Sequence, residues 1–161
     1  MSALAQGISD IQNRIRTYEQ RTKGLHESNT IRVLVNPLLR ALGWNLDNLD
    51  EAQSEYRKAG CDNPVDYALF LEERPVLFVE AKAMGENINE RKWILQTLNY
   101  ANSCGVEWAV LTNGVEWRIY NVHEKVDAEN KLFYTVNLRE MASAQVALHL
   151  SPLSRASMAQ S

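Results

Sequence analysis

The chain has 161 residues, which is the size of one compact domain and too short for two ordinary domains. Hydrophobic residues make up 45% of the sequence and charged residues 23%, a composition that excludes a disordered, collagen-like or coiled-coil chain. The formal net charge is -3, but residues 11–45 are basic on balance and residues 46–80 are acidic, so a polyanionic partner is neither required nor excluded.

No stretch of the sequence approaches the ~20 consecutive apolar residues of a membrane span, and the first residues lack the pattern of a signal peptide. We therefore expect a cytoplasmic protein without a membrane partner. Cys61 and Cys104 stand far apart and without a CxxC spacing, which predicts two reduced thiols rather than a disulfide framework or a zinc site.

The first predicted element is an amphipathic helix. Its apolar residues recur at steps of four and three, at Leu4, Ile8, Ile11, Ile15 and Tyr18. Core packing is the expected role of this apolar face, and contact with a second copy in a homodimer is the alternative.

A second helix is predicted over residues 27–42. Its expected buried residues are Ile31, Leu34, Leu38 and Leu42. Gly43 is expected to end this helix in a left-handed conformation, whereas Pro37 must kink it or shift its start.

Strands dominate the rest of the chain and are expected at residues 52–57, 64–71, 75–83, 108–112, 115–122 and 132–138. A helix at 89–104 precedes the pair of strands around Asn113-Gly114, the strongest hairpin signal in the sequence. A closing helix is expected at 139–150, and residues 151–161 are small and polar, which predicts a disordered tail. This order of elements predicts one α/β (α+β) domain over residues 1–150, with a mixed β-sheet flanked by helices.

The most informative segment consists of two apolar runs on either side of Glu72-Glu73-Arg74. If these three polar residues form a hairpin loop, Asp66 lies directly opposite Glu80. Because side chains alternate along a strand, Asp66, Glu80 and Lys82 are then predicted to project from one face. The opposite, core face is expected to carry Val65, Tyr67, Leu69, Leu77, Val79 and Ala81. A loop of two or four residues would displace this pairing by one residue.

Two facing carboxylates about 5 Å apart repel each other, so the predicted pair requires compensation. Mg²⁺ provides it well, because this ion is usually held by one or two carboxylates together with water and substrate phosphate. The Ala81 carbonyl can add a neutral ligand. Lys82 would lie beside the metal, where its charge can hold a water molecule or help to deprotonate it. From spacing alone, a salt-bridged patch on a solvated sheet face is an equal alternative.

The succession of Asp66, an apolar strand and Glu80-Ala81-Lys82 resembles the signature of the PD-(D/E)xK nuclease superfamily. A longer ordered set over about residues 25–138 is similar to the N-terminal nuclease domain of type I restriction enzyme R subunits: Glu27, Pro37-Leu38-Leu39, Leu42-Gly43-Trp44, Glu55-Tyr56, Asp66-Tyr67, Glu80-Ala81-Lys82, Gln96, Tyr100, Leu111-Thr112-Asn113-Gly114 and Trp117. The sequence departs from the family pattern in having Val65 rather than proline before Asp66. It also shows no helicase, translocase or subunit-docking region, so powered restriction is not implied.

This resemblance implies a restriction-endonuclease-like core of three layers and Mg²⁺-dependent hydrolysis of phosphodiester bonds, with Mn²⁺ as a substitute ion. It implies that Asp66 and Glu80 bind the metal and that Lys82 is the catalytic lysine. Glu27 matches a helical acid that approaches the metal in many members. An ordinary surface acid near a helix N-terminus is an equal alternative for Glu27.

The resemblance also extends to the helix at 89–104, where Gln96 and Tyr100 match a Gln-x-x-x-Tyr element. The two residues are four apart and therefore share one side of the helix. Gln96 would orient the attacking water or contact a phosphate, and Lys92 and Tyr100 would extend the same side toward the nucleic acid. A half-exposed polar helix surface is the alternative for each residue taken alone.

The leading hypothesis is therefore a metal-dependent endonuclease acting on DNA, with RNA not excluded as a substrate. One alternative is a non-catalytic module on a nuclease fold that binds nucleic acid or protein. Another is a subunit that is active only with a helicase or methylase partner. The tryptophans are expected mainly in the core, with base stacking as the alternative role: Trp44, Trp93, Trp108 and Trp117.

Overall fold

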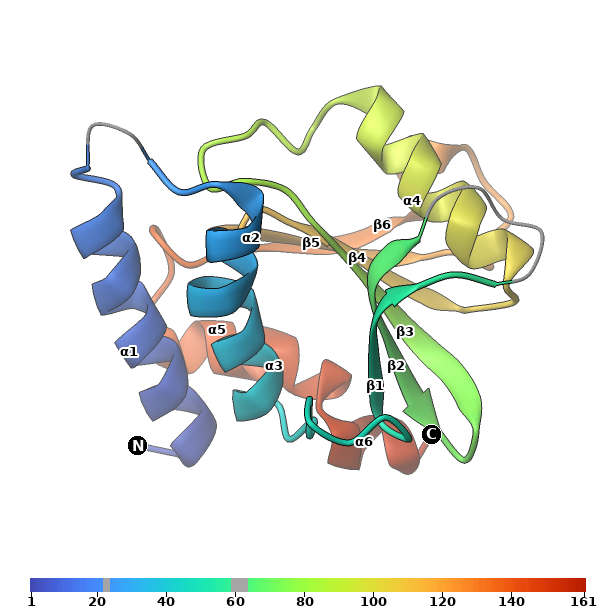
Figure 1. The fold of residues 1–161 in the computed structure, drawn as a ribbon, viewed down its shortest axis with the longest axis horizontal. Coiled ribbons are helices and arrows are strands. Elements are labelled where there is room, and N and C mark those ends of the chain that lie inside the picture. The colour runs from blue at the N-terminus through green and yellow to red at the C-terminus, as the bar shows by residue number, and fades with distance from the viewer. Residues whose placement is uncertain (22–23, 59–63) are drawn as a thin grey trace.

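The computed structural model describes residues 1–21, 24–58 and 64–161 (Figure 1). Within these ranges, six strands form one sheet in the order in which they occur along the chain: β1 (Ala52–Tyr56), β2 (Val65–Leu71), β3 (Arg74–Ala81), β4 (Trp108–Thr112), β5 (Glu116–Asn121) and β6 (Leu132–Asn137). Neighbouring strands are antiparallel except β3 and β4, which are parallel and connected through α4 (Arg91–Ser103). The prediction of a mixed sheet flanked by helices is therefore confirmed.

The helices begin with α1 (Ala3–Tyr18), whose buried residues are those of the predicted apolar face: Ala5, Ile8, Ile11 and Ile15. The closing helix α5 (Ser143–Leu150) is shorter than predicted, and a single 3-10 turn, Ala128–Lys131, precedes β6. None of the helices in the described part of the chain has both the length and the apolar character needed to cross a bilayer.

The predicted second helix is one helical segment in three parts: α2 (Glu27–Thr30), a π-helical stretch (Ile31–Val35) and α3 (Asn36–Ala41). Pro37 explains this division, because it has no N–H to donate to the carbonyl of Val33 four residues earlier. Arg14 of α1 supplies the missing donor, with its Nη1 3.1 Å from the Val33 oxygen. Gly43 ends the segment with a φ of +93°, as predicted.

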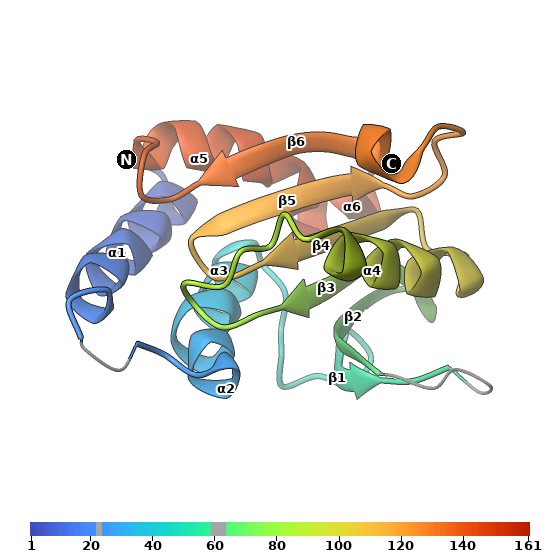
Figure 2. The same cartoon turned by 90° about the horizontal axis from the view of Figure 1, so that it is seen from above.

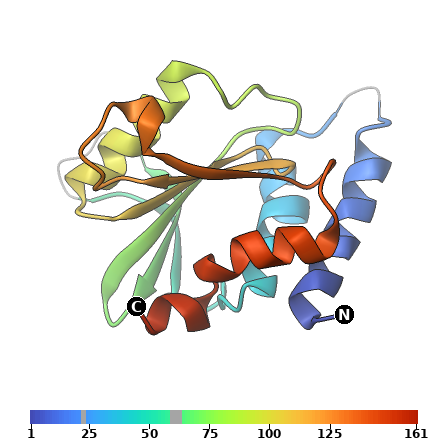
Figure 3. The same cartoon turned by 180° about the vertical axis from the view of Figure 1, so that it is seen from behind.

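Both faces of the sheet are buried, so the face of the β2–β3 hairpin that was predicted to carry the charged residues is not a solvated surface. One core lies between the sheet and α1, α3 and α5, and it contains most of the residues predicted on the core face, among them Leu69, Leu77 and Val79. The second core lies beneath α4 and contains Val65 and Phe78. Figures 2 and 3 show the two helical layers on opposite sides of the sheet. The physical reason is the parallel pairing of β3 and β4, which requires a crossover connection over one face.

Residues 151–161 differ from the expected disordered tail. They form a 3-10 turn, Ser151–Leu153, and a short helix, α6 (Arg155–Ala159). Trp44 explains why these residues are ordered, because its buried Nε1 donates a hydrogen bond to the carbonyl of Leu153 at 3.0 Å. The N–H of Arg155 also donates to the Leu42 carbonyl at 3.0 Å. These partners lie more than 100 residues away along the chain, where the local polar composition gives no sign of them.

Candidate active site

The β2–β3 hairpin has a tighter turn than predicted. Glu72 and Glu73 form a two-residue turn with φ values of +50° and +67°, which is the type I′ geometry that suits the twist of paired strands. A two-residue turn alone would shift the pairing by one residue. The register shifts back between Leu69 and Phe70, where Val76 is the extra residue on β3. The predicted three-residue loop is therefore wrong, but the bulge restores the register that it implied.

Asp66 and Glu80 lie next to each other at the end of this hairpin. The register pairs Tyr67 with Val79, and one residue further along each strand stand Asp66 and Glu80. The Asp66 N–H donates to Glu80 Oε1 at 3.2 Å, and the Ala81 N–H donates to Asp66 Oδ2 at 2.7 Å. Main-chain donors thus hold one oxygen of each carboxylate, and a side-chain hydrogen bond also joins the two carboxyl groups.

The carboxyl group of Glu80 is electrostatically unusual. Its side chain is only 13% exposed. Burial, a side-chain hydrogen bond with Asp66 and the charge of the Asp66 carboxylate together raise the pKa of Glu80 from 4.5 to about 8, against the opposing effects of Lys82 and of the Asp66 N–H. Without a cation, the pair therefore retains a proton near neutral pH, because two ionised carboxylates in this buried position repel each other.

Lys82 lies beside the carboxylates. Its Nζ is 3.7 Å from Glu80 Oε2 and 3.8 Å from the centre of the Trp93 ring, and its side chain is 15% exposed. The Lys82 N–H donates to the Thr112 carbonyl at 2.8 Å, which fixes the main chain against β4. Lys92 is more exposed; its Nζ lies 4.5 Å from the same indole ring and 3.4 Å from Glu90. The alternative of a solvated salt-bridged patch does not describe Glu80 and Lys82, because both are largely buried.

Glu27 approaches this group of charges from α2. Its partial burial raises its pKa, and the nearby Asp66 and Glu86 add to the rise while Lys82 lowers the pKa. Within the described residues, however, no group of three or more His, Cys, Asp or Glu is arranged to hold a metal. Glu27 is thus close enough to Asp66 to interact with it electrostatically, but it does not join Asp66 and Glu80 in a metal-ligand cluster.

Gln96 and Tyr100 extend the site along α4. Both line a small cavity of about 20 Å³ together with Glu80, so the structure does bring the Gln-x-x-x-Tyr element to the predicted carboxylate. The hydroxyl of Tyr100 donates to the Tyr56 carbonyl and accepts from the Lys58 N–H, both at 3.0 Å. Tyr100 therefore holds β1 against α4, a structural contact that the sequence did not reveal.

Three residues that shape the site were missed as functional candidates. Trp93 was expected mainly in the core, yet its half-buried ring contacts both lysines. The Thr30 Oγ1 accepts from the Met84 N–H at 2.9 Å, and Asn113 Nδ2 donates to the Glu86 carbonyl at 2.9 Å. These two bonds connect the chain that follows Lys82 to α2 and to the β4–β5 turn. The sequence could have identified Trp93 as a site residue, because it stands three residues before Gln96 and therefore on the same side of the helix.

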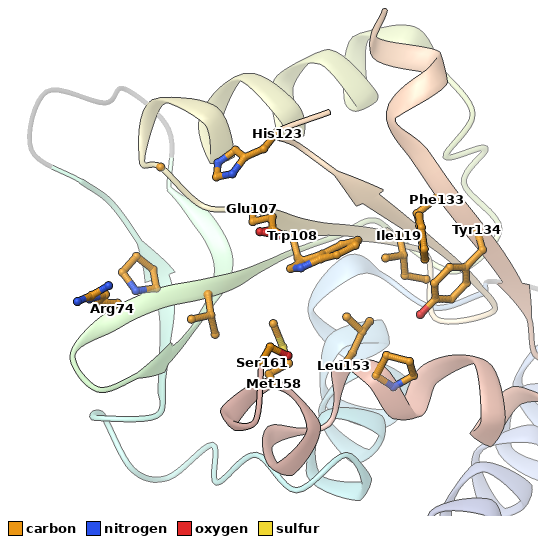
Figure 4. Close-up of a pocket in the computed structure, with 14 residues that line it drawn as sticks. Arg74, Glu107, Trp108, Ile119, His123, Phe133, Tyr134, Leu153, Met158 and Ser161 are labelled. Atoms are coloured by element: carbon orange, nitrogen blue, oxygen red, sulfur yellow. The ribbon is translucent and has the colours of Figure 1, made fainter. Parts of the chain in front are cut away.

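A larger cavity lies elsewhere in the molecule, where β3 and β4 begin (Figure 4). Its volume is about 720 Å³, and its lining is mainly apolar, with Trp108, Ile119 and Phe133 on the sheet and Leu153 and Met158 from the last helical turns. None of the predicted site residues lines it. The candidate active site is therefore the group of charges at the opposite end of β3.

Comparisons with known proteins identify the family and the fold of this chain. The family profile described as type I restriction enzyme R protein N terminus matches residues 26–134, which include every predicted site residue. Among solved structures, the chain is similar to a fragment described as an HsdR subunit of a type I restriction enzyme from Vibrio vulnificus YJ016, with a TM-score of 0.55 and 22% identity. The match covers 80% of this chain and 26% of the other, and it shows a restriction-endonuclease-like fold. A comparison with curated protein sequences gave no match.

Proposed function

Because this chain belongs to the family of type I restriction enzyme R protein N termini, we propose that it is a metal-dependent nuclease domain that hydrolyses phosphodiester bonds in DNA. The observation that carries the proposal is the adjacent, partly buried pair of Asp66 and Glu80 with the ammonium group of Lys82 beside it. The chain spans about a quarter of the length of the similar R-subunit structure, so the activity of a whole R subunit is a further proposal rather than a premise.

Mg²⁺ fits the donor set of this site. Asp66 and Glu80 are adjacent oxygen donors. The pKa of Glu80 is raised first by burial and then by its contact with Asp66, and a bound cation would offset both effects by favouring the ionised carboxylates. These two residues would hold the ion, with the Ala81 carbonyl as a neutral ligand and Glu27 at a greater distance. When bound, Mg²⁺ would polarise the scissile phosphate and acidify a water molecule, and Mn²⁺ is proposed to substitute for it.

The other residues are proposed to act on water and on the substrate. The Lys82 ammonium would hold the attacking water and offset the negative charge that develops on the phosphate. Gln96 shares a small cavity with Glu80, which supports a role in orienting this water. Lys92 is exposed on the same helix and is proposed to contact a backbone phosphate of the nucleic acid. Tyr100 is proposed to support Gln96 at this surface, because its hydroxyl is already bonded to the main chain of β1.

Membership of this family places the domain in the context of restriction–modification, in which an R subunit works with other subunits on DNA. We therefore propose helicase or methylase subunits as partners, with a homodimer as the alternative assembly. RNA remains an alternative substrate, since nothing in the paired carboxylates distinguishes a ribose from a deoxyribose.

The test is a cleavage assay with supercoiled plasmid, single-stranded DNA and RNA, in Mg²⁺, in Mn²⁺ and in a chelator. Asp66→Asn, Glu80→Gln and Lys82→Met should each reduce metal-dependent cleavage by about 100-fold or more. Glu116→Gln is the matched control. Glu116 also pairs with a cation two residues later on its strand, Arg118 at 3.1 Å, but it lies outside the site. This variant should cleave like the wild type.

Calorimetric titration with Mg²⁺ completes the test. Binding that is lost in Asp66→Asn, together with cleavage that requires Lys82, supports the proposal. Cleavage that appears only when partner subunits are added supports it in a partner-dependent form. Metal-independent cleavage that survives all three substitutions overturns the assignment. So does a folded chain that binds DNA but shows no turnover with any substrate, metal or partner, because it would be a non-catalytic module.

A further inference from the structure

The side chain of Lys82 needs more support than Glu80 provides. Its main chain is fixed by the hydrogen bond to Thr112, but four flexible carbon atoms separate that main chain from the ammonium group. The Nζ lies 3.7 Å from Glu80 Oε2, well beyond the 2.7–2.9 Å or so of a charge-assisted hydrogen bond. A loose ion pair of this length does not define where the ammonium group stands.

The indole ring of Trp93 provides the closer constraint. The Lys82 Nζ lies over this ring at 3.8 Å from its centre, well within the ~6 Å range of a cation–π interaction. Tryptophan has the most favourable ring face for a cation, and the ammonium group here is largely shielded from water. The ring thus forms one wall of the ammonium position, and the Glu80 carboxylate forms another.

We propose that Trp93 is a positioning residue, whose indole face holds the Lys82 ammonium group beside Glu80. This inference rests on the proposed function, in which Lys82 acts on water and phosphate. It adds a residue of α4 to a site otherwise built from the β2–β3 hairpin, and it explains how the helix and the hairpin together define the location of the charge.

A packing role alone explains Trp93 less well. Its Nε1 is buried and has no hydrogen-bond partner among the described residues. Burying an unpaired N–H costs free energy, and phenylalanine or leucine would fill space at this position without that cost. The contact with the Lys82 ammonium group therefore explains why this position has tryptophan, whose ring face binds a cation most favourably. Lys92, 4.5 Å from the same ring, adds a second positive charge on the exposed side of the site.

The test compares Trp93→Phe and Trp93→Leu with Trp108→Leu as the matched control. Trp108 is also half-buried and meets Phe133 edge-to-face, but it lines the distant apolar cavity. Trp93→Leu keeps an apolar side chain and removes the ring face, so kcat for metal-dependent cleavage should fall about tenfold, equivalent to about 1.4 kcal/mol, with little change in KM. Trp93→Phe should restore part of the loss. Trp108→Leu should retain the wild-type kcat despite a comparable change in melting temperature.

A second measurement does not depend on activity. In the NMR spectrum of the metal-free protein, the ε protons of Lys82 should be shifted upfield by the ring current of Trp93. The Lys82→Met variant identifies their resonance. The shift should vanish in Trp93→Leu, persist in part in Trp93→Phe and remain in Trp108→Leu.

The two readouts separate failure of this inference from failure of the proposed function. Unshifted ε protons in the wild type overturn the positioning role whatever the activity. A Trp93→Leu variant that is folded and cleaves with the wild-type kcat also overturns it. If the wild type has the shifted resonance but neither binds Mg²⁺ nor cleaves under any condition tested, the nuclease assignment fails while the contact between Trp93 and Lys82 stands.

Discussion

Replacing Glu80 with glutamine should stabilise the metal-free protein, and the gain should grow with pH. Below pH 4.5 the Glu80 carboxyl is protonated in both the folded and the unfolded chain, so it contributes no pH dependence. Between pH 4.5 and about 8, the unfolded chain releases this proton while the folded chain keeps it. Folding stability therefore decreases as pH rises through this window, and the loss is complete above the folded pKa.

The size of the effect follows from the same pKa. Each pKa unit is equivalent to about 1.4 kcal/mol, so the rise from 4.5 to about 8 corresponds to at most about 5 kcal/mol. The Glu80 side chain is 13% exposed, so solvent screens the penalty only slightly. Glutamine keeps an oxygen that can accept from the Asp66 N–H and removes the charge, but it also loses the attraction to Lys82. We expect a net gain of about 3 kcal/mol at pH 9 and little gain at pH 4.

Urea unfolding in a chelator measures this difference at pH 4, 7 and 9. Glu116→Gln provides the control, because Glu116 is a more exposed carboxylate whose ion pair with Arg118 has good geometry, and its substitution should not become more stabilising as pH rises. Addition of Mg²⁺ should stabilise the wild type more than Glu80→Gln, because the ion binds the folded state. The reasoning is refuted if the stabilities of the wild type and Glu80→Gln differ by a constant amount from pH 4 to 9, or if the wild type is the more stable at pH 9.

Two other substitutions test how the site is held. Gly114→Ala should lower the free energy of unfolding by about 2–4 kcal/mol, measured by urea unfolding. Gly114 has a φ of +86°, and an added Cβ would lie 2.7 Å from Cδ1 of the buried Leu34. A variant as stable as the wild type would contradict this packing. Tyr100→Phe should lower the free energy of unfolding by about 1–2 kcal/mol and leave DNA affinity unchanged, because the Tyr100 hydroxyl bonds to the main chain at β1. DNA affinity is measured by fluorescence anisotropy. A large loss of DNA binding at unchanged stability would contradict this structural role of Tyr100.

Local sequence patterns predicted most of the helices and strands, and they also predicted which charged residues form the candidate site. The spacing of Ile8, Ile11 and Ile15 predicted α1, and Asn113-Gly114 predicted the β4–β5 hairpin. The alternation in the two runs around the β2–β3 turn predicted that Asp66 and Glu80 would project from the same face, whereas their opposite placement was predicted from a three-residue loop that the structure does not have. These signals are readable because helix and strand periodicity and turn chemistry depend on residues only a few positions apart.

Only the tertiary structure decided how the site is enclosed. The extra residue at Val76 restored the register between β2 and β3 that the two-residue turn would have displaced. No local sequence pattern predicted this bulge. The crossover through α4 covered the sheet face that carries Asp66, Glu80 and Lys82, which shielded Glu80 from solvent and brought Trp93 over Lys82. Trp44 likewise ordered the last residues through a hydrogen bond to Leu153. Such contacts join segments far apart in sequence, and they form because a folded chain must bury both faces of its sheet and pair its buried polar groups.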